Sequence, residues 1–196
     1  YFYITKNGDW ASNEDSRLIV QKKDSDRLRI VGDRLLDLKE VSVIYSTMMG
    51  PYGENGNIMG LADMLKVPII GCGILASALA LDKHLSKIVA EKIGIPTVDY
   101  IAVEKDDSVD EIVENIKTKI NFPCFVKPTN LGTCGFIFKA SDEDDFRRKW
   151  HKTIRDNKYS QHYLIEKFIP NIEVRVFIYE DEYGRLRTND EYVTIL

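Results

Sequence analysis

The pattern of apolar residues changes near residues 83–95, and this change constrains the fold more than any other feature of the sequence. Before it, runs rich in β-branched residues at 41–46 and 67–70 enclose a stretch with helical spacing at 58–65. After it, strand-like runs predominate. Alternating strands and helices followed by a strand-rich half predict an α/β chain with two parts that meet at this point.

Three helices are predicted from residue 77 onward. The clearest is predicted over 77–93, because Gly94 can end a helix and Pro96 cannot continue one. A second is predicted from a capping pair at 107–108 to about residue 120, and a third from a capping signal at 141–144 through residue 150.

Short apolar runs predict the strands. An N-terminal strand at 1–5 is followed by a turn signal at 6–9. The later strands are predicted at 98–103, 124–127, 136–139, 163–166, 173–179 and 187–195, with a turn at 180–184 between the last two.

The composition is that of an ordinary globular protein. Apolar residues make up 44% of the 196 residues and charged residues 30%, and the net charge of −4 leaves no basic face for nucleic acid. No apolar run approaches the roughly 20 residues of a membrane span, and no signal peptide opens the chain, although it begins with Tyr1 rather than methionine. Three widely spaced cysteines suit a reducing compartment. A cytoplasmic protein without a membrane or nucleic-acid partner is therefore expected.

Lys127 is the first candidate for chemistry. It ends an apolar strand, and Pro128 fixes the backbone where the side chain leaves the sheet. In the loop that follows, backbone amides around Gly132 and Gly135 can approach phosphate oxygens closely. A lysine beside such a loop suits phosphate binding, while the alternative is a solvated turn residue. The order of residues is not that of a P-loop.

Two glutamates, Glu166 and Glu173, lie near predicted strand ends. Each either serves a ligand or forms a structural ion pair. Between them, Phe168 and Ile169 form either an apolar platform for a purine or part of the core.

The sequence predicts no metal site. No two of the three histidines have the spacing of metal ligands, and Cys134 has no identifiable histidine partner. The acidic and amide residues near the last turn are candidates by composition alone, and are expected to be solvated: Asp181, Glu182, Asn189, Asp190 and Glu191.

Three stretches together resemble the D-alanine–D-alanine ligase family of ATP-grasp enzymes. They are GPYGENGNIMGLADMLKVPIIGCGILASALALDK, FPCFVKPTNLG and LIEKFIPNIE, in the order and spacing of that family over roughly residues 45–180. The resemblance implies an incomplete Rossmann-like N-terminal (pre-ATP-grasp) domain over 1–82 and the central ATP-grasp subdomain over 83–196. It further implies ATP-dependent joining of D-alanine, or a related D-amino or hydroxy acid, for peptidoglycan precursors.

The resemblance also assigns site residues. Lys83 and Lys127 match lysines that contact the ATP phosphates, and Glu173 matches a ribose-binding glutamate. Glu166, Lys167 and Ile169 match positions that line the adenine pocket. Thr133 and Cys134 match the two serines of a loop that covers the phosphates.

Two departures from the family pattern matter. Met49 stands where the family has a histidine near the first amino-acid substrate, and Phe136 stands where the phosphate loop has a second glycine. A ring at that position is expected either to keep φ negative or to pack inward as a strand residue. The loop is then expected to be displaced and to bind ATP more weakly.

By this resemblance several groups are expected outside the chain. They include the glutamate for the first D-alanine, a stabilising arginine and the ligands of Mg²⁺. The expected partners are ATP, a small amino acid and a second copy of the chain through its N-terminal part. Two readings stay open: part of a longer active ligase, or a shortened, inactive relative that binds nucleotide or a partner chain.

Overall fold

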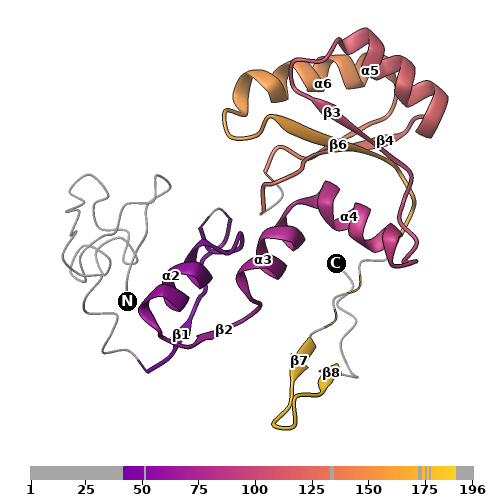
Figure 1. Ribbon diagram of the computed structural model, residues 1–196. Helices are drawn as coiled ribbons and strands as arrows, with labels where there is room; N and C mark the ends of the chain where they lie inside the picture. The colour runs from indigo at the N-terminus through magenta and orange to yellow at the C-terminus, as the bar shows by residue number, and fades with distance from the viewer. Residues whose placement is uncertain are drawn as a thin grey trace, which may run out of the picture.

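The computed structural model describes residues 42–50, 52–132, 135–171, 174, 176 and 178–188 (Figure 1). The predicted strand at 1–5 and the turn at 6–9 lie outside the described residues. So do three of the predicted site residues, Thr133, Cys134 and Glu173.

A four-stranded sheet is the centre of the second part. It consists of β3 (Tyr100–Glu104), β6 (His162–Lys167), β4 (Cys124–Pro128) and β5 (Phe138–Ala140), in the order β3-β6-β4-β5. Every neighbouring pair is antiparallel. The register places Glu166 opposite both Tyr100 and Phe125. Opposed residues project to the same side of a sheet, so these three share one face, and Lys127 joins them two residues after Phe125.

The other face of this sheet holds the core. Helix α5 (Val109–Asn115), the π-helical segment η3 (Ile116–Ile120) and helix α6 (Glu143–Asp156) belong to this side, and α5 and α6 lie opposite α4 in Figure 1. Trp150 stacks on Phe146 with ring centroids 5.7 Å apart and meets Tyr163 edge-on at 5.1 Å. All three rings are almost fully buried.

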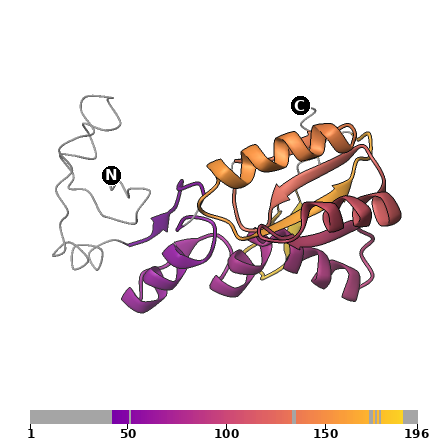
Figure 2. The ribbon, with the colours of Figure 1, turned by 90° about the horizontal axis from the view of Figure 1, so that it is seen from above.

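The first part of the described chain is smaller. Strand β1 (Ile44–Tyr45) pairs in parallel with β2 (Ile69–Ile70), and helix α2 (Asn57–Leu65) connects them. Both strands are shorter than the runs that predicted them. Figure 2 shows β1 and α2 to one side of the four-stranded sheet, joined to it through α3 and α4. The proposed boundary between 82 and 83 stays a prediction.

The single helix predicted over 77–93 is wrong, because the structure has two. Helix α3 (Ile74–Leu81) and helix α4 (Lys83–Lys92) are separated by Asp82, whose ψ of 106° is not helical. The Asp82 carboxylate accepts hydrogen bonds from the backbone N–H groups of His84 and Leu85, both at 3.0 Å. This N-cap starts a new helix, so Lys83 is its first residue rather than a mid-helix position.

Other predicted bounds shift as well. Helix α6 is capped by Asp142, which accepts from the N–H of Asp145 at 2.9 Å, and it runs to Asp156 instead of ending near 150. Strand β5 begins at Phe138, so Phe136 lies in the preceding turn with φ of +60°. The expectation of a negative φ or of an inward-packed strand residue at 136 is therefore wrong.

The last two strands form an exposed hairpin. Strands β7 (Ile178–Glu180) and β8 (Leu186–Thr188) pair antiparallel around the predicted turn. Among the described residues, no helix is both long enough and apolar enough to span a bilayer.

Candidate functional site

Three charged side chains meet on the face of the sheet opposite the core. Lys127, from β4, donates a hydrogen bond to Oε2 of Glu166, from β6. The Nζ atom of Lys87, from α4, lies 3.1 Å from the other carboxylate oxygen, Oε1. Only 12% of the Glu166 side chain is exposed, so its carboxylate is largely shielded from solvent. The predicted pair Lys127 and Glu166 is thus brought together by the fold.

The two lysines decide the charge of Glu166. Burial by itself raises the pKa of the carboxyl group, but the hydrogen bond from Lys127 and the charges of Lys127 and Lys87 outweigh burial. The pKa of Glu166 therefore lies below its usual value, and the group is ionised at neutral pH. With two ammonium groups around one carboxylate, the cluster carries a net positive charge.

Lys83 is held at the loop that follows β4. Its backbone N–H donates to the carbonyl of Thr129 at 2.9 Å, and its Nζ donates to the carbonyl of Leu131 at 2.7 Å. The Asp82 cap, which makes Lys83 the first residue of α4, sets this position. One predicted lysine therefore lies beside the glycine loop and the other beside Glu166.

An aromatic pair lies next to the charged cluster. The rings of Phe125 and Phe168 are 5.7 Å apart, and Lys127 lies 5.9 Å from the centroid of Phe125. The ammonium group of Lys139 lies 3.4 Å from the centroid of Phe168. Of the two readings of Phe168, apolar platform or core, its contacts with Phe125 and Lys139 favour a platform on the charged face.

The remaining described site residues lie at the end of β6. The Lys167 backbone donates to the carbonyl of Asp99 at 3.0 Å, while its ammonium group lies 4.0 Å from the Asp99 carboxylate. Ile169 follows with 48% of its surface exposed. Neither side chain contacts Lys127 or Glu166 in any interaction found among the described residues.

Two residues with a part in this arrangement were not predicted. Lys87 lies four residues after Lys83 on the same helix, a spacing that places both on one face and could have indicated it. Glu54 lies in the loop after β1, where its Oε2 accepts a hydrogen bond from the N–H of Gly50 at 2.5 Å. A Cβ atom on Gly132 would lie 2.3 Å from the same oxygen, so the side chain of Glu54 reaches the glycine loop.

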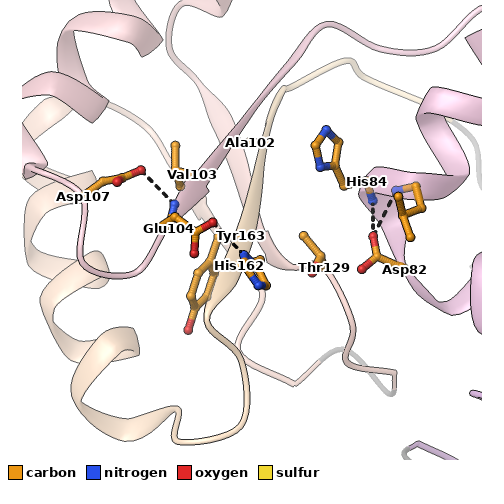
Figure 3. A pocket seen from close by; sticks show the side chains of 10 residues that line it. Asp82, His84, Ala102, Val103, Glu104, Asp107, Thr129, His162 and Tyr163 are labelled. Atoms are coloured by element: carbon orange, nitrogen blue, oxygen red, sulfur yellow. Dashed lines mark hydrogen bonds and ion pairs between the residues drawn. The ribbon is translucent and has the colours of Figure 1, made fainter.

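A pocket of about 300 Å³ lies beside this site but not on it (Figure 3). It is bordered by the start of α4, at Asp82 and His84, by the C-terminal end of β3 and by the N-terminal end of β6. There the Nδ1 atom of His162 lies 2.9 Å from Oε1 of Glu104. Thr129 also lines the pocket, and its buried Oγ1 has no hydrogen-bond partner in the described part of the chain. None of the predicted site residues lines it.

Among the acidic and amide candidates near the last hairpin, Asp181 stabilises the turn, whereas Asn189, Asp190 and Glu191 lie outside the described residues. Asp181 accepts hydrogen bonds from the backbone N–H groups of Tyr183 and Arg185 and from Nε of Arg187, at 2.8–2.9 Å. The expectation that Asp181 is simply solvated is therefore wrong. Within the described ranges, no group of three or more histidine, cysteine, aspartate or glutamate residues could hold a metal ion.

Comparison with known proteins gives consistent matches. A family model described as D-ala D-ala ligase C-terminus matches residues 89–194. A D-alanine–D-alanine ligase of Streptococcus gordonii is 29% identical over 185 residues, which are 89% of this chain and 51% of the relative. Another, from Acetivibrio thermocellus, is 37% identical over 139 residues, which are 69% of this chain and 36% of the relative. The chain thus spans about half the length, or less, of these curated relatives.

Solved structures show the same fold. The VanG D-Ala:D-Ser ligase from Enterococcus faecalis superposes with a TM-score of 0.72 at 20% identity, covering 95% of this chain and 57% of that one. The D-alanine–D-alanine ligase from Helicobacter pylori gives 0.71 at 20% identity, with 95% and 59% covered. The predicted α/β fold of the ATP-grasp type is therefore confirmed.

Proposed function

The chain belongs to the D-Ala–D-Ala ligase C-terminus family, and from this premise we propose that it binds ATP and serves the ATP-dependent ligation of D-alanine to D-alanine. The product of that ligation is a peptidoglycan precursor, which is consistent with a cytoplasmic location. The observation that carries the proposal is the positively charged cluster of Lys127, Glu166 and Lys87 beside a glycine loop to which Lys83 is tied.

The residues present fit ATP. Lys127 and Lys83 are proposed to contact the phosphates as point charges, close to the glycine loop, where the Nζ atom of Lys83 donates to the Leu131 carbonyl. Glu166 is proposed to accept a hydrogen bond from the base, with Lys167 and Ile169 at the edge of the same pocket. The proposal keeps Glu173 for the ribose, and Thr133 and Cys134 for the covering loop.

When bound, ATP supplies the phosphoryl group that activates a carboxylate toward an amine. In such transfers positioning and charge stabilisation do most of the work, and Mg²⁺ contributes to both. The role assigned to this chain is to bind the triphosphate, to orient it through two lysines, and to hold the base against the aromatic platform of Phe125 and Phe168. The metal ligands are proposed to lie outside the described residues.

A second function is nucleotide binding without ligation. Two departures from the family pattern favour it: Met49, which is 73% exposed and cannot transfer a proton, and Phe136, which lies in the phosphate loop with a positive φ. Ligation requires a small amino acid as a second ligand, whereas nucleotide binding alone does not. Dimerisation through residues 1–82 stays a prediction in both.

Calorimetric titration with ATP and Mg²⁺ tests the nucleotide site. Lys127→Ala removes a charged contact with a phosphate, so the affinity for ATP should fall about 10- to 100-fold at matched ionic strength. Equal affinities in the two proteins would remove Lys127 from the site. A product assay with D-alanine then separates the two functions, because dipeptide formation supports ligation and ATP binding without it supports the second function.

A further inference from the structure

Lys87 is held in place by three different contacts. Its Nζ lies 3.1 Å from Oε1 of Glu166, donates to the carbonyl of Val98 at 3.2 Å, and lies 5.1 Å from the ring centroid of Tyr100. Only 14% of its side chain is exposed. An ammonium group fixed by a carboxylate, a carbonyl and an aromatic face has little freedom to turn toward a ligand.

Lys127 differs from Lys87 although both bind the same carboxylate. Its side chain is 28% exposed, twice the value for Lys87. Apart from Glu166, the contact found for its ammonium group is the ring of Phe125, at 5.9 Å. An arriving phosphate can therefore draw Lys127 away from Glu166, whereas Lys87 stays in place.

This asymmetry has an electrostatic consequence. If Lys127 turns to a phosphate, Glu166 loses one of its two cations while it remains mostly buried. A buried carboxylate without a partner is strongly disfavoured, so a second, immobile cation is required for the exchange to be favourable. Without Lys87, the pair of Lys127 and Glu166 is neutral, and it has to be broken before Lys127 can serve a ligand.

We infer that Lys87 is a positioning residue, the permanent counter-ion of Glu166, which keeps this carboxylate ionised and oriented while Lys127 transfers from Glu166 to a phosphate of bound ATP. The inference rests on the proposed ATP site. Lys87 itself does not touch the nucleotide. It acts through Glu166, and it also determines whether Lys127 is available.

The test compares Lys87→Met with Lys92→Met, which removes the same charge from an exposed position on the same helix. In calorimetric titrations of the 196-residue chain, Lys87→Met should weaken ATP binding about tenfold or more, and Lys92→Met about twofold or less. A wild-type chain without ATP binding would overturn the proposed function and this inference together. A wild-type chain that binds, with Lys87→Met binding equally well, would overturn the inference alone.

The pH dependence separates a counter-ion from a general structural role. The groups facing Glu166 are Lys127 from β4, Lys87 from α4 and Tyr100 from β3, whose own pKa is raised by burial and by Glu91, so that it stays neutral. In Lys87→Met, ATP binding should be coupled to proton uptake by Glu166, and affinity should improve relative to Lys92→Met as pH falls from about 7.5 to 5. Parallel pH profiles would contradict the inference.

A double variant covers the case in which Lys87→Met fails to fold. Lys87→Met with Glu166→Gln leaves no uncompensated buried charge, and it should bind ATP within about twofold of Glu166→Gln alone. If Lys87 attracted the phosphates directly, the double variant would lose about tenfold more than the single one, and the inference would be wrong.

Discussion

The two faces of the four-stranded sheet differ in what they contribute. Toward α5 and α6 the strands present Ile101, Val126 and Ile165, which are buried and apolar. Toward α4 the neighbouring residues along the same strands include charged and aromatic ones, such as Lys127 and Glu166, beside the apolar Ala102 and Leu164. Because side chains alternate along a strand, one short segment supplies both faces. Stability therefore depends mainly on one face, and the proposed binding of ATP on the other.

The largest expected effect is the loss of stability from a substitution on the core face. Trp150→Ala removes a side chain that packs against both Phe146 and Tyr163, and the free energy of unfolding should fall by about 3–5 kcal/mol. Phe125→Ala is the matched change on the other face, where the ring is only half-buried, and it should cost about 1–2 kcal/mol.

Chemical denaturation measures both variants, and ATP titration of the folded fraction completes the comparison. Phe125→Ala should weaken ATP binding more than Trp150→Ala does, in spite of its smaller effect on stability. The reverse order would show that the two faces are not separable.

Much of this division could be predicted from the sequence. Strand runs such as 98–103 and 124–127 differ from β3 and β4 by one or two residues at most ends, because period-two apolar patterns reflect burial directly. Lys127 is predicted to end its strand, but β4 continues through Pro128, so Lys127 is a paired residue whose side chain lies on a face of the sheet. The pairing of Lys127 with Glu166 depends on the register between β4 and β6, which cannot be predicted from the local sequence pattern of either strand.

The misses have physical reasons as well. Apolar spacing continues through Asp82, so the local hydrogen bonds of its side chain outweighed a pattern that predicted one helix. Glu54 meets Gly132 across 78 residues of sequence, and nothing local to either residue signals that contact. The spacing of Lys87 from Lys83 on one helix face could have indicated it, but the family pattern names residues that contact ATP and not the residues behind them.

A smaller effect is expected from removing the N-cap of one helix on each face of the sheet. Asp82→Ala removes the cap of α4, and Asp142→Ala removes the cap of α6 on the opposite face. Each should lower the free energy of unfolding by about 1 kcal/mol. Asp82→Ala alone should also weaken ATP binding, because the start of α4 positions Lys83 at the loop.

Thermal unfolding measures the stability of the two cap variants, and calorimetry measures their affinity for ATP. Similar losses of stability with a drop in ATP affinity only for Asp82→Ala are expected. Equal ATP affinities would mean that Lys83 does not depend on the cap.

The smallest expected effect concerns Phe136 in the phosphate loop. Its φ of +60° is unfavourable for a residue with a side chain, so Phe136→Gly should relieve strain of about 1 kcal/mol, partly offset by loss of the contacts of the ring. Asn121→Gly is the matched control, since Asn121 has φ of +63° at the end of η3, far along the chain from the loop. Both variants should unfold at slightly higher denaturant concentration than the wild type. Only Phe136→Gly should also tighten ATP binding, because a glycine lets the loop approach the phosphates as in the family pattern. If Phe136→Gly gains stability but binds ATP no better than Asn121→Gly, the ring does not obstruct the loop, and the displacement expected from the sequence is wrong.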